Sequence, residues 1–387
     1  MYDVIHIKVM EGKLICLLLA KKIDEEACIE LLHDKKFSYE KFISLLFRHK
    51  IAGYITKILM DSKIIYEIHP KWSQVLINYI YGNQKRNEIA FNYIGKIVEE
   101  FNNNHISYVV LNGMDYLLSI YQEFGCRFMK DIDILVDYSQ LSKVEKIFDV
   151  NGYRQVEYNH TGLQEVTREE KIFKLCAHNV LSPYVYETGE LLCPFINVEM
   201  AFDIFPRFKN RAFKNLKEYS LRNIQLIEYS NIRFNVLSNE MKLIQMAIHI
   251  YNDSVKLVNV INGKSDELVK YLDMYLLIDR CEMNWHTIID ISRDYEICDI
   301  VYFALYHLNM LFEECVDDRI MKKIQPDDLS YLNCFGAEDG NCFNWKVGFL
   351  ERIFRENRLE EAYEAIQSAD EYNRYIKMIG EVKNGTE

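Results

Sequence analysis

The clearest pattern in the chain lies in residues 127–136, which read Arg-Phe-Met-Lys-Asp-Ile-Asp-Ile-Leu-Val. Alternating polar and apolar residues from Asp131 onward predict a strand that becomes fully apolar at its end. Side chains two positions apart point to one face, so Asp131 and Asp133 should lie about 6.5–7 Å apart along it. Two carboxylates there are costly without a cation or donors between them, and Mg²⁺ binds carboxylates together with substrate phosphates. The alternative is an edge strand with a solvated acidic face.

A short strand and a turn are expected just upstream of this segment. Residues 106–111 are β-branched and aromatic, and Gly113 follows where a helix should begin. Glycine at such a turn lets backbone N–H groups approach a phosphate, so Asn112 and Gly113 are candidates for nucleotide binding. Arg127 and Lys130 could pair with a triphosphate, Arg127 in bidentate fashion. The alternative role of Arg127 is to balance nearby acidic charge.

A third carboxylate is expected from a neighbouring strand. Residues 195–203 alternate in polarity, which predicts a strand whose polar face carries Glu199 and Asp203. Glu199 is the first choice because it is the polar centre of an otherwise apolar strand. Asp203, nearer the strand end, is the second choice, and an exposed polar face is the alternative to both.

Helical periodicity dominates on either side of this α/β segment. A long helix is predicted over residues 83–104, and residues 153–205 are expected to be rich in strands. Strand, helix, strand and helix follow one another over residues 106–152, which indicates an α/β unit. The expected organisation is an N-terminal helical region at 1–83, a catalytic core at 84–235 and a C-terminal helical region at 236–387.

Composition narrows the class of protein. The chain of 387 residues is 49% hydrophobic, enough for a sizeable core and too apolar for a disordered protein. A net charge of −12 repels phosphate backbones and disfavours a long nucleic acid as partner. The 10 cysteines are scattered without a Cys-x-x-Cys pair, which fits reduced thiols and predicts a cytoplasmic protein. No signal peptide and no membrane span are expected.

These residues resemble a known family. Leu111-Asn112-Gly113, followed by Arg127 and the strand Asp131-Ile132-Asp133-Ile134-Leu135-Val136, resembles the signature of the uncharacterised nucleotidyltransferase family, within the polymerase-β-like nucleotidyltransferase superfamily. That family typically reads Leu-Lys-Gly and then Arg-x-x-x-Asp-Ile-Asp-Leu-Leu-Val. Its third acid lies in a later strand of the Val-Glu-Leu-His-Trp type, into which Val198-Glu199-Met200 fits. The resemblance covers roughly residues 35–315.

The resemblance implies a fold, an activity and a set of site residues. It implies an α+β protein with a polymerase-β-like nucleotidyltransferase core, a mixed sheet with helices, between N- and C-terminal helical segments. The implied reaction moves a nucleoside monophosphate from a nucleoside triphosphate such as ATP to a hydroxyl-type acceptor and releases pyrophosphate. Asp131 and Asp133 would hold Mg²⁺ or Mn²⁺, and Glu199 would complete the metal site or take the acceptor's proton. A small molecule, peptide or protein suits the acidic chain better as acceptor than a nucleic acid.

Two departures from the family pattern concern the nucleotide-binding half. Asn112 stands where the family usually has lysine, and Ala201 stands where histidine is usual. The fuller Gly-Ser or Gly-Gly turn of the superfamily is also missing from the sequence. A second reading therefore stays open, in which the protein binds nucleotides without turnover, as an antitoxin-like interaction protein that keeps the fold.

Overall fold

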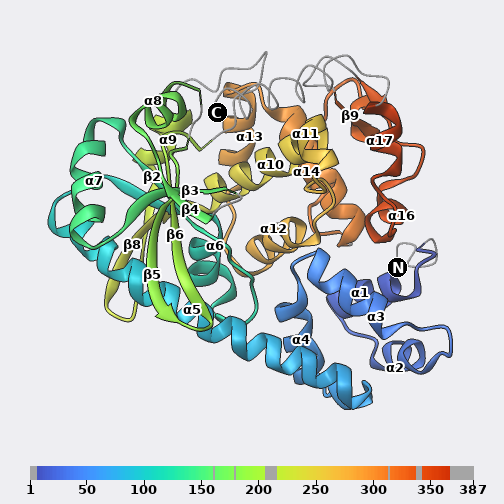
Figure 1. Ribbon diagram of the computed structural model, residues 1–387. Helices are drawn as coiled ribbons and strands as arrows, with labels where there is room; N and C mark the ends of the chain where they lie inside the picture. Colours follow the sequence, from blue (N-terminus) through green and yellow to red (C-terminus); the bar gives the residue numbers. More distant parts are fainter. Residues whose placement is uncertain are drawn as a thin grey trace.

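The computed structural model describes residues 7–159, 162–177, 180–204, 216–312, 314–336 and 342–366. Its strands form a mixed sheet at one end of the molecule, and helices from both ends of the chain gather at the other end (Figure 1). The predicted α+β class, a mixed sheet with helices, is confirmed. Within the described residues, none of the helices has both the length and the apolar character needed to span a membrane.

The main sheet has eight strands in the order β4-β3-β5-β6-β2-β1-β8-β7. Strand β2 lies in the middle, antiparallel to β1 and parallel to β6. A second, two-stranded sheet pairs β9 with β10. The strands are β1 (Tyr108–Leu111), β2 (Ile132–Val136), β3 (Arg154–Asn159), β4 (Gly162–Glu165), β5 (Tyr184–Glu190), β6 (Cys193–Ala201), β7 (Ile224–Tyr229), β8 (Ile232–Leu237), β9 (Cys334–Phe335) and β10 (Phe343–Asn344).

Strand β2 is buried along most of its length, as the apolar run predicted. Ile132, Ile134 and Val136 are almost fully buried, whereas Asp133 between them is partly exposed. Such a strand needs a covered face on each side, and α6 (Asn112–Tyr116) packs against both β1 and β2. The alternation therefore directs the Asp133 side chain away from the buried isoleucines.

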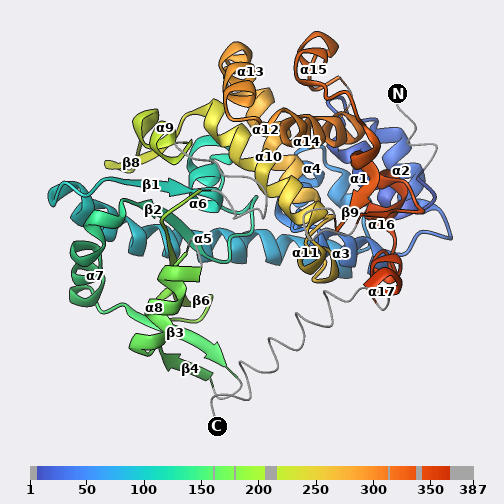
Figure 2. The same cartoon turned by 90° about the horizontal axis from the view of Figure 1, so that it is seen from above.

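The longest helix, α5 (Pro70–Asn103), runs beneath the sheet and extends toward the N-terminal helices (Figures 1 and 2). It packs against β6 and β8. The predicted helix over 83–104 has the correct end but begins earlier, because Pro70 occupies the first helical turn and His69 caps it. The expected boundary between residues 83 and 84 falls inside this helix, and the division into three regions stays a prediction.

The N-terminal and C-terminal helices pack on each other (Figure 1). The His49 carbonyl accepts from the Val269 N–H at 3.2 Å, and Arg48 donates to the Ile353 carbonyl at 2.5 Å. The N-terminal helices are α1 (Met10–Leu19), α2 (Glu25–His33), α3 (Tyr39–Arg48) and α4 (Ala52–Asp61). The C-terminal helices are α10 (Asn239–Val255), α11 (Leu257–Ile261), α12 (Leu268–Arg280), α13 (Trp285–Asp294), α14 (Cys298–Leu311), α15 (Asp318–Ile324), α16 (Phe349–Phe354) and α17 (Glu360–Ile366).

Three further helices, α7 (Leu141–Val150), α8 (Arg168–Ala177) and α9 (Leu216–Arg222), belong to the sheet-containing part. Helix α8 interrupts residues 153–205, which the sequence predicted to be rich in strands. Its start is a reciprocal cap in which Thr167 and Glu170 each bind the other's backbone N–H. The remaining helical segments are short: η2 (Ile64–Glu67), the π-helix η3 (Leu117–Tyr121), η4 (Tyr138–Gln140) and η5 (Ser330–Asn333).

Candidate functional site

The three predicted carboxylates come from adjacent strands at the centre of the sheet. Asp133 lies in β2 and is paired in register with Glu199 of the parallel strand β6 and with Leu111 of β1. Residues in register on parallel strands point to the same face, so Asp133 and Glu199 share one side of the sheet. Asp131 directly precedes β2, two residues from Asp133, and is half-buried like it.

The electrostatics of Asp133 show that these acids lie close enough to repel. Burial and then the negative charge of Asp131 raise the pKa of the Asp133 carboxyl to about 7, and Glu199 adds to the rise. A hydrogen bond from the Asn112 side-chain amide at 2.7 Å and the charge of Arg127 act in the opposite direction. The site therefore holds more negative charge than its donors balance.

A cavity of about 230 Å³ opens over these acids and brings most of the predicted residues together. Six of the seven residues predicted for the site line it, and the seventh, Glu199, lies beside Asp133 on β6. The six are Asn112, Gly113, Arg127, Lys130, Asp131 and Asp133. Their roles in chemistry or binding stay predictions, and so does the choice of Glu199 over Asp203 as third carboxylate.

The turn between β1 and α6 has the tight geometry expected of a glycine-containing turn. Asn112 adopts φ 51°, a left-handed conformation that asparagine tolerates better than most residues. A Cβ on Gly113 would lie 2.9 Å from the Met129 Cγ and 3.1 Å from the Arg127 Nη1. Any larger residue would have to displace the Met129 side chain, so glycine lets the turn lie close to the segment that precedes the acidic strand.

Arg127 makes a buried ion pair with a residue far away in the sequence. Its Nε and Nη2 donate to the Asp273 carboxylate of α12 at 2.8–3.1 Å, and the Tyr121 hydroxyl donates to the same carboxylate at 2.7 Å. Burial alone lowers the pKa of the guanidinium, but Asp273 outweighs that effect and raises it. The structure thus gives Arg127 a protein partner at the place where the sequence predicted a phosphate.

Polar side chains of α5 hold the loop that leads into the acidic strand, and the sequence analysis did not identify them. Asn83 donates to the carbonyls of Gly125 and Arg127 at 2.9 and 3.0 Å. Asn87, one turn later, donates to the Arg127 carbonyl at 2.9 Å, and Arg86 donates to the Met129 carbonyl. The sequence did contain a signal for them, because Asn83 and Asn87 are four positions apart and lie on one face of the helix. Asparagine destabilises the interior of a helix, so such a pair indicates that the side-chain amides form hydrogen bonds elsewhere.

The helical regions also contribute side chains to this cavity. Lys50 from the end of α3, His249 from α10 and Lys270 from α12 line the same cavity as the acids. Burial lowers the pKa of His249. No local pattern pointed to Lys50 or Lys270, because their proximity to the acids depends on how distant helices pack.

The donor chemistry at this cavity suits a hard divalent cation. Carboxylate oxygens are the ligands of Mg²⁺, which typically takes only one or two of them and fills its remaining positions with water and phosphate oxygens. Within the part of the chain that the structure describes, no three His, Cys, Asp or Glu side chains form a group that could hold a metal ion. A site formed by Asp131 and Asp133 with substrate oxygens fits both observations, and the raised pKa of Asp133 is the feature that a cation would relieve.

Comparison with known proteins gives a family and a distant structural likeness. The model of the uncharacterised nucleotidyltransferase family matches residues 35–313, which is most of the chain. The fold is similar to that of an antigenic nucleotidyltransferase-like protein from Paracoccidioides brasiliensis, with 12% sequence identity and a TM-score of 0.37. That match covers 60% of this chain and 92% of the other. No curated protein matches the chain.

Proposed function

This chain belongs to the uncharacterised nucleotidyltransferase family, and from that membership we propose that it is a metal-dependent nucleotidyltransferase. In the proposed reaction, an acceptor oxygen attacks the α-phosphorus of a nucleoside triphosphate. The new P–O bond forms as the bond from the α-phosphorus to the bridging oxygen breaks, so pyrophosphate leaves with that electron pair. The acceptor's proton passes to Glu199 or to water.

One observation supports this proposal above the others. Asp133 is a half-buried carboxyl whose pKa is raised to about 7 by burial and by two neighbouring carboxylates, and it lines a cavity that also contains lysines. Strongly perturbed acids in a cleft are typical of sites that bind cations or transfer protons. An acidic group kept there at a cost in stability is expected to serve a ligand.

Each residue has a task in the proposed mechanism that its position allows. Asp131 and Asp133 would hold Mg²⁺, or Mn²⁺ in its place. When bound, the ion supplies positive charge that offsets the charge on the phosphates. Asn112 keeps the Asp133 carboxylate in place through its 2.7 Å hydrogen bond. Lys130, exposed at the cavity, would meet the phosphates, and the net charge of −12 favours a small molecule, peptide or protein as acceptor.

The test is pyrophosphate release from labelled nucleoside triphosphates in the presence of Mg²⁺, with candidate acceptors and with the protein itself as acceptor. We expect Asp133→Ala to abolish release. Asp137→Ala is the matched control, because Asp137 follows the same strand and its carboxylate accepts from the backbone N–H and the hydroxyl of Ser139, away from the cavity lining. Equal activity of the wild type and the Asp133→Ala variant would contradict the proposal.

A nucleotide-binding protein without turnover is the second candidate. The contact between Asn112 and Asp133 favours it, because an uncharged amide stands where the family usually has a lysine and occupies one oxygen of the predicted metal ligand. This candidate predicts that triphosphates bind and that no acceptor yields pyrophosphate. Label transfer to any acceptor would exclude it.

A further inference from the structure

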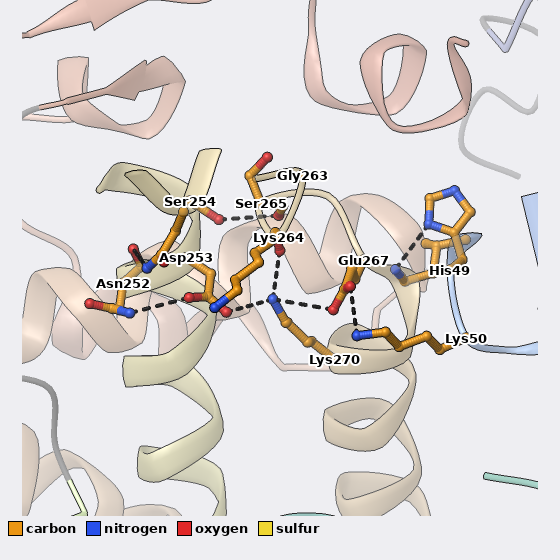
Figure 3. A network of polar contacts seen from close by, with 12 residues as sticks. His49, Lys50, Asn252, Asp253, Ser254, Gly263, Lys264, Ser265, Glu267 and Lys270 are labelled. Carbon is orange, nitrogen blue, oxygen red and sulfur yellow. Dashed lines mark hydrogen bonds and ion pairs between the residues drawn. The ribbon is translucent and has the colours of Figure 1, made fainter. Parts of the chain in front are cut away.

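Two lysines, one from the N-terminal and one from the C-terminal helices, face the cavity that contains Asp131 and Asp133. Lys50 follows α3 in the N-terminal helices, and Lys270 lies in the first turn of α12. Figure 3 shows them on either side of Glu267, at the junction where His49 receives the first backbone N–H groups of α12. One wall of the cavity is therefore acidic and another carries two ammonium groups.

A single carboxylate bridges these two lysines. Glu267 lies 2.7 Å from the Lys50 Nζ and 3.6 Å from the Lys270 Nζ (Figure 3). Lys270 also contacts Asp253 at 2.7 Å and donates to the Lys264 carbonyl at 2.6 Å. Glu267 thus lies between two cations, at a position that would suit a phosphate oxygen equally well, since ammonium groups bind phosphates and carboxylates alike.

The backbone at Lys50 ends helix α3 in a left-handed turn. The Ile51 N–H donates to the Leu46 carbonyl and the Lys50 N–H to the Phe47 carbonyl, both at 3.0 Å, which is a Schellman ending of α3. Lys50 is the left-handed residue of that motif, with φ 58°, where glycine is the ordinary residue. His105 and Glu296 end helices α5 and α13 in the same way, so this ending fixes where Lys50 leaves α3 and does not by itself assign a task to its side chain.

Charge and size both identify the ligand group. The family's usual lysine is replaced by Asn112, and Arg127 is engaged by Asp273, so Lys130 is the one predicted cation left for a polyphosphate and further cations must come from the helical regions. The cavity of about 230 Å³ is smaller than the roughly 300–1,000 Å³ of sites that enclose drug-sized ligands. It therefore suits the phosphate tail, and the sugar and base would project beyond it.

We propose that Lys50 and Lys270 bind the terminal phosphates of the nucleoside triphosphate, and that a phosphate displaces Glu267 from between them. This inference rests on the substrate of the proposed function but not on turnover. It assigns the helical regions a direct part in substrate binding, opposite the carboxylates of the sheet.

The test is equilibrium binding of a fluorescent nucleoside triphosphate to the full chain in Mg²⁺, with inorganic tripolyphosphate as competitor. We expect Lys50→Gly and Lys270→Met each to weaken binding about tenfold or more, as for a lost charged hydrogen bond. Glu267→Gln should tighten binding several-fold, because it removes the competing anion. Tripolyphosphate should displace the nucleotide from the wild type and compete less well against both lysine variants.

Two controls separate binding from folding. Lys57→Met removes a lysine of similar exposure that pairs with Asp61 and Glu123 beside a different cavity, and it should leave the affinity unchanged. Lys50→Gly should melt at the wild-type temperature or above it, because glycine suits the left-handed position, so its lost affinity cannot be attributed to unfolding.

The outcomes distinguish this inference from the proposed activity. If Lys270→Met and Glu267→Gln change the affinity in the same direction, or neither changes it, the network is only structural and the inference is wrong. It is also wrong if the wild type binds no triphosphate, or if turnover occurs with the same KM in both lysine variants. If binding depends on the two lysines but no pyrophosphate is released, the inference about the lysines stands and the proposed nucleotidyltransferase activity is wrong.

Discussion

The ion pair between Arg127 and Asp273 allows a sharp test of what Arg127 does. The Asp273 side chain is 3% exposed and that of Arg127 is 13% exposed, and three donor–acceptor contacts of 2.8–3.1 Å join them. Asp273→Asn keeps the shape and removes the charge, which leaves a buried guanidinium without its counter-ion. Breaking one partner of such a pair costs about 3–5 kcal/mol.

The assay is urea unfolding of the wild type, Asp273→Asn, Arg127→Met and the double variant Arg127→Met/Asp273→Leu. At roughly 2 °C per kcal/mol, the loss for Asp273→Asn corresponds to about 6–10 °C in Tm. The double variant should be closer to the wild type than either single variant, because it leaves no uncompensated charge.

The same variants report on nucleotide binding. If Asp273 holds Arg127 as part of the structure, Asp273→Asn destabilises the protein and does not tighten nucleotide binding. A loss below about 1 kcal/mol, together with tighter binding, would refute this reasoning. It would assign Arg127 to the phosphates, as the sequence predicted.

Three further predictions follow from individual contacts. Gly53→Ala places a Cβ against the Gly125 carbonyl oxygen, so it should destabilise the protein by about 1–3 kcal/mol and weaken nucleotide binding, which unfolding and binding titrations would measure. Burial lowers the pKa of His307 to about 4, so the unfolded chain takes up a proton that the folded chain excludes as the pH falls from about 6.5 to 4. This proton uptake should lower the free energy of unfolding of the wild type by about 3 kcal/mol between pH 6.5 and pH 4. The measurement is the difference in unfolding free energy between the wild type and His307→Asn at the two pH values. EDTA should stop pyrophosphate release, and added Mg²⁺ or Mn²⁺ should restore it; release that persists in EDTA contradicts a metal requirement.

The local part of the site could be predicted from the sequence because its geometry is local. Two residues of one strand share a face whatever surrounds them, so the position of Asp131 next to Asp133 needed only the period of the strand. The pairing of Asp133 with Glu199 is not local, but both belong to alternating segments, and a parallel register brings them level. The resemblance to a family added this pairing to the pattern.

The rest of the site depends on packing between distant segments. Asp273 lies 146 residues from Arg127, and Lys50 and Lys270 reach the same cavity only because α3 and α12 join at His49. Some missed features did have a local signal. The Thr167 and Glu170 capping pair marks the start of α8, and Pro70 marks the start of α5.

An acidic protein can bind a polyphosphate if its cations are concentrated at the site. The net charge is −12, but charges beyond about 8–10 Å are largely screened at physiological ionic strength. Within the cavity, Lys50, Lys130 and Lys270 act at short range. Among the described residues that line it, Glu267 is the acid that bridges two of these lysines. The net negative charge therefore disfavours the binding of long polyanions to the surface. The affinity for a short polyphosphate depends instead on the lysines at the junction of the two helical regions.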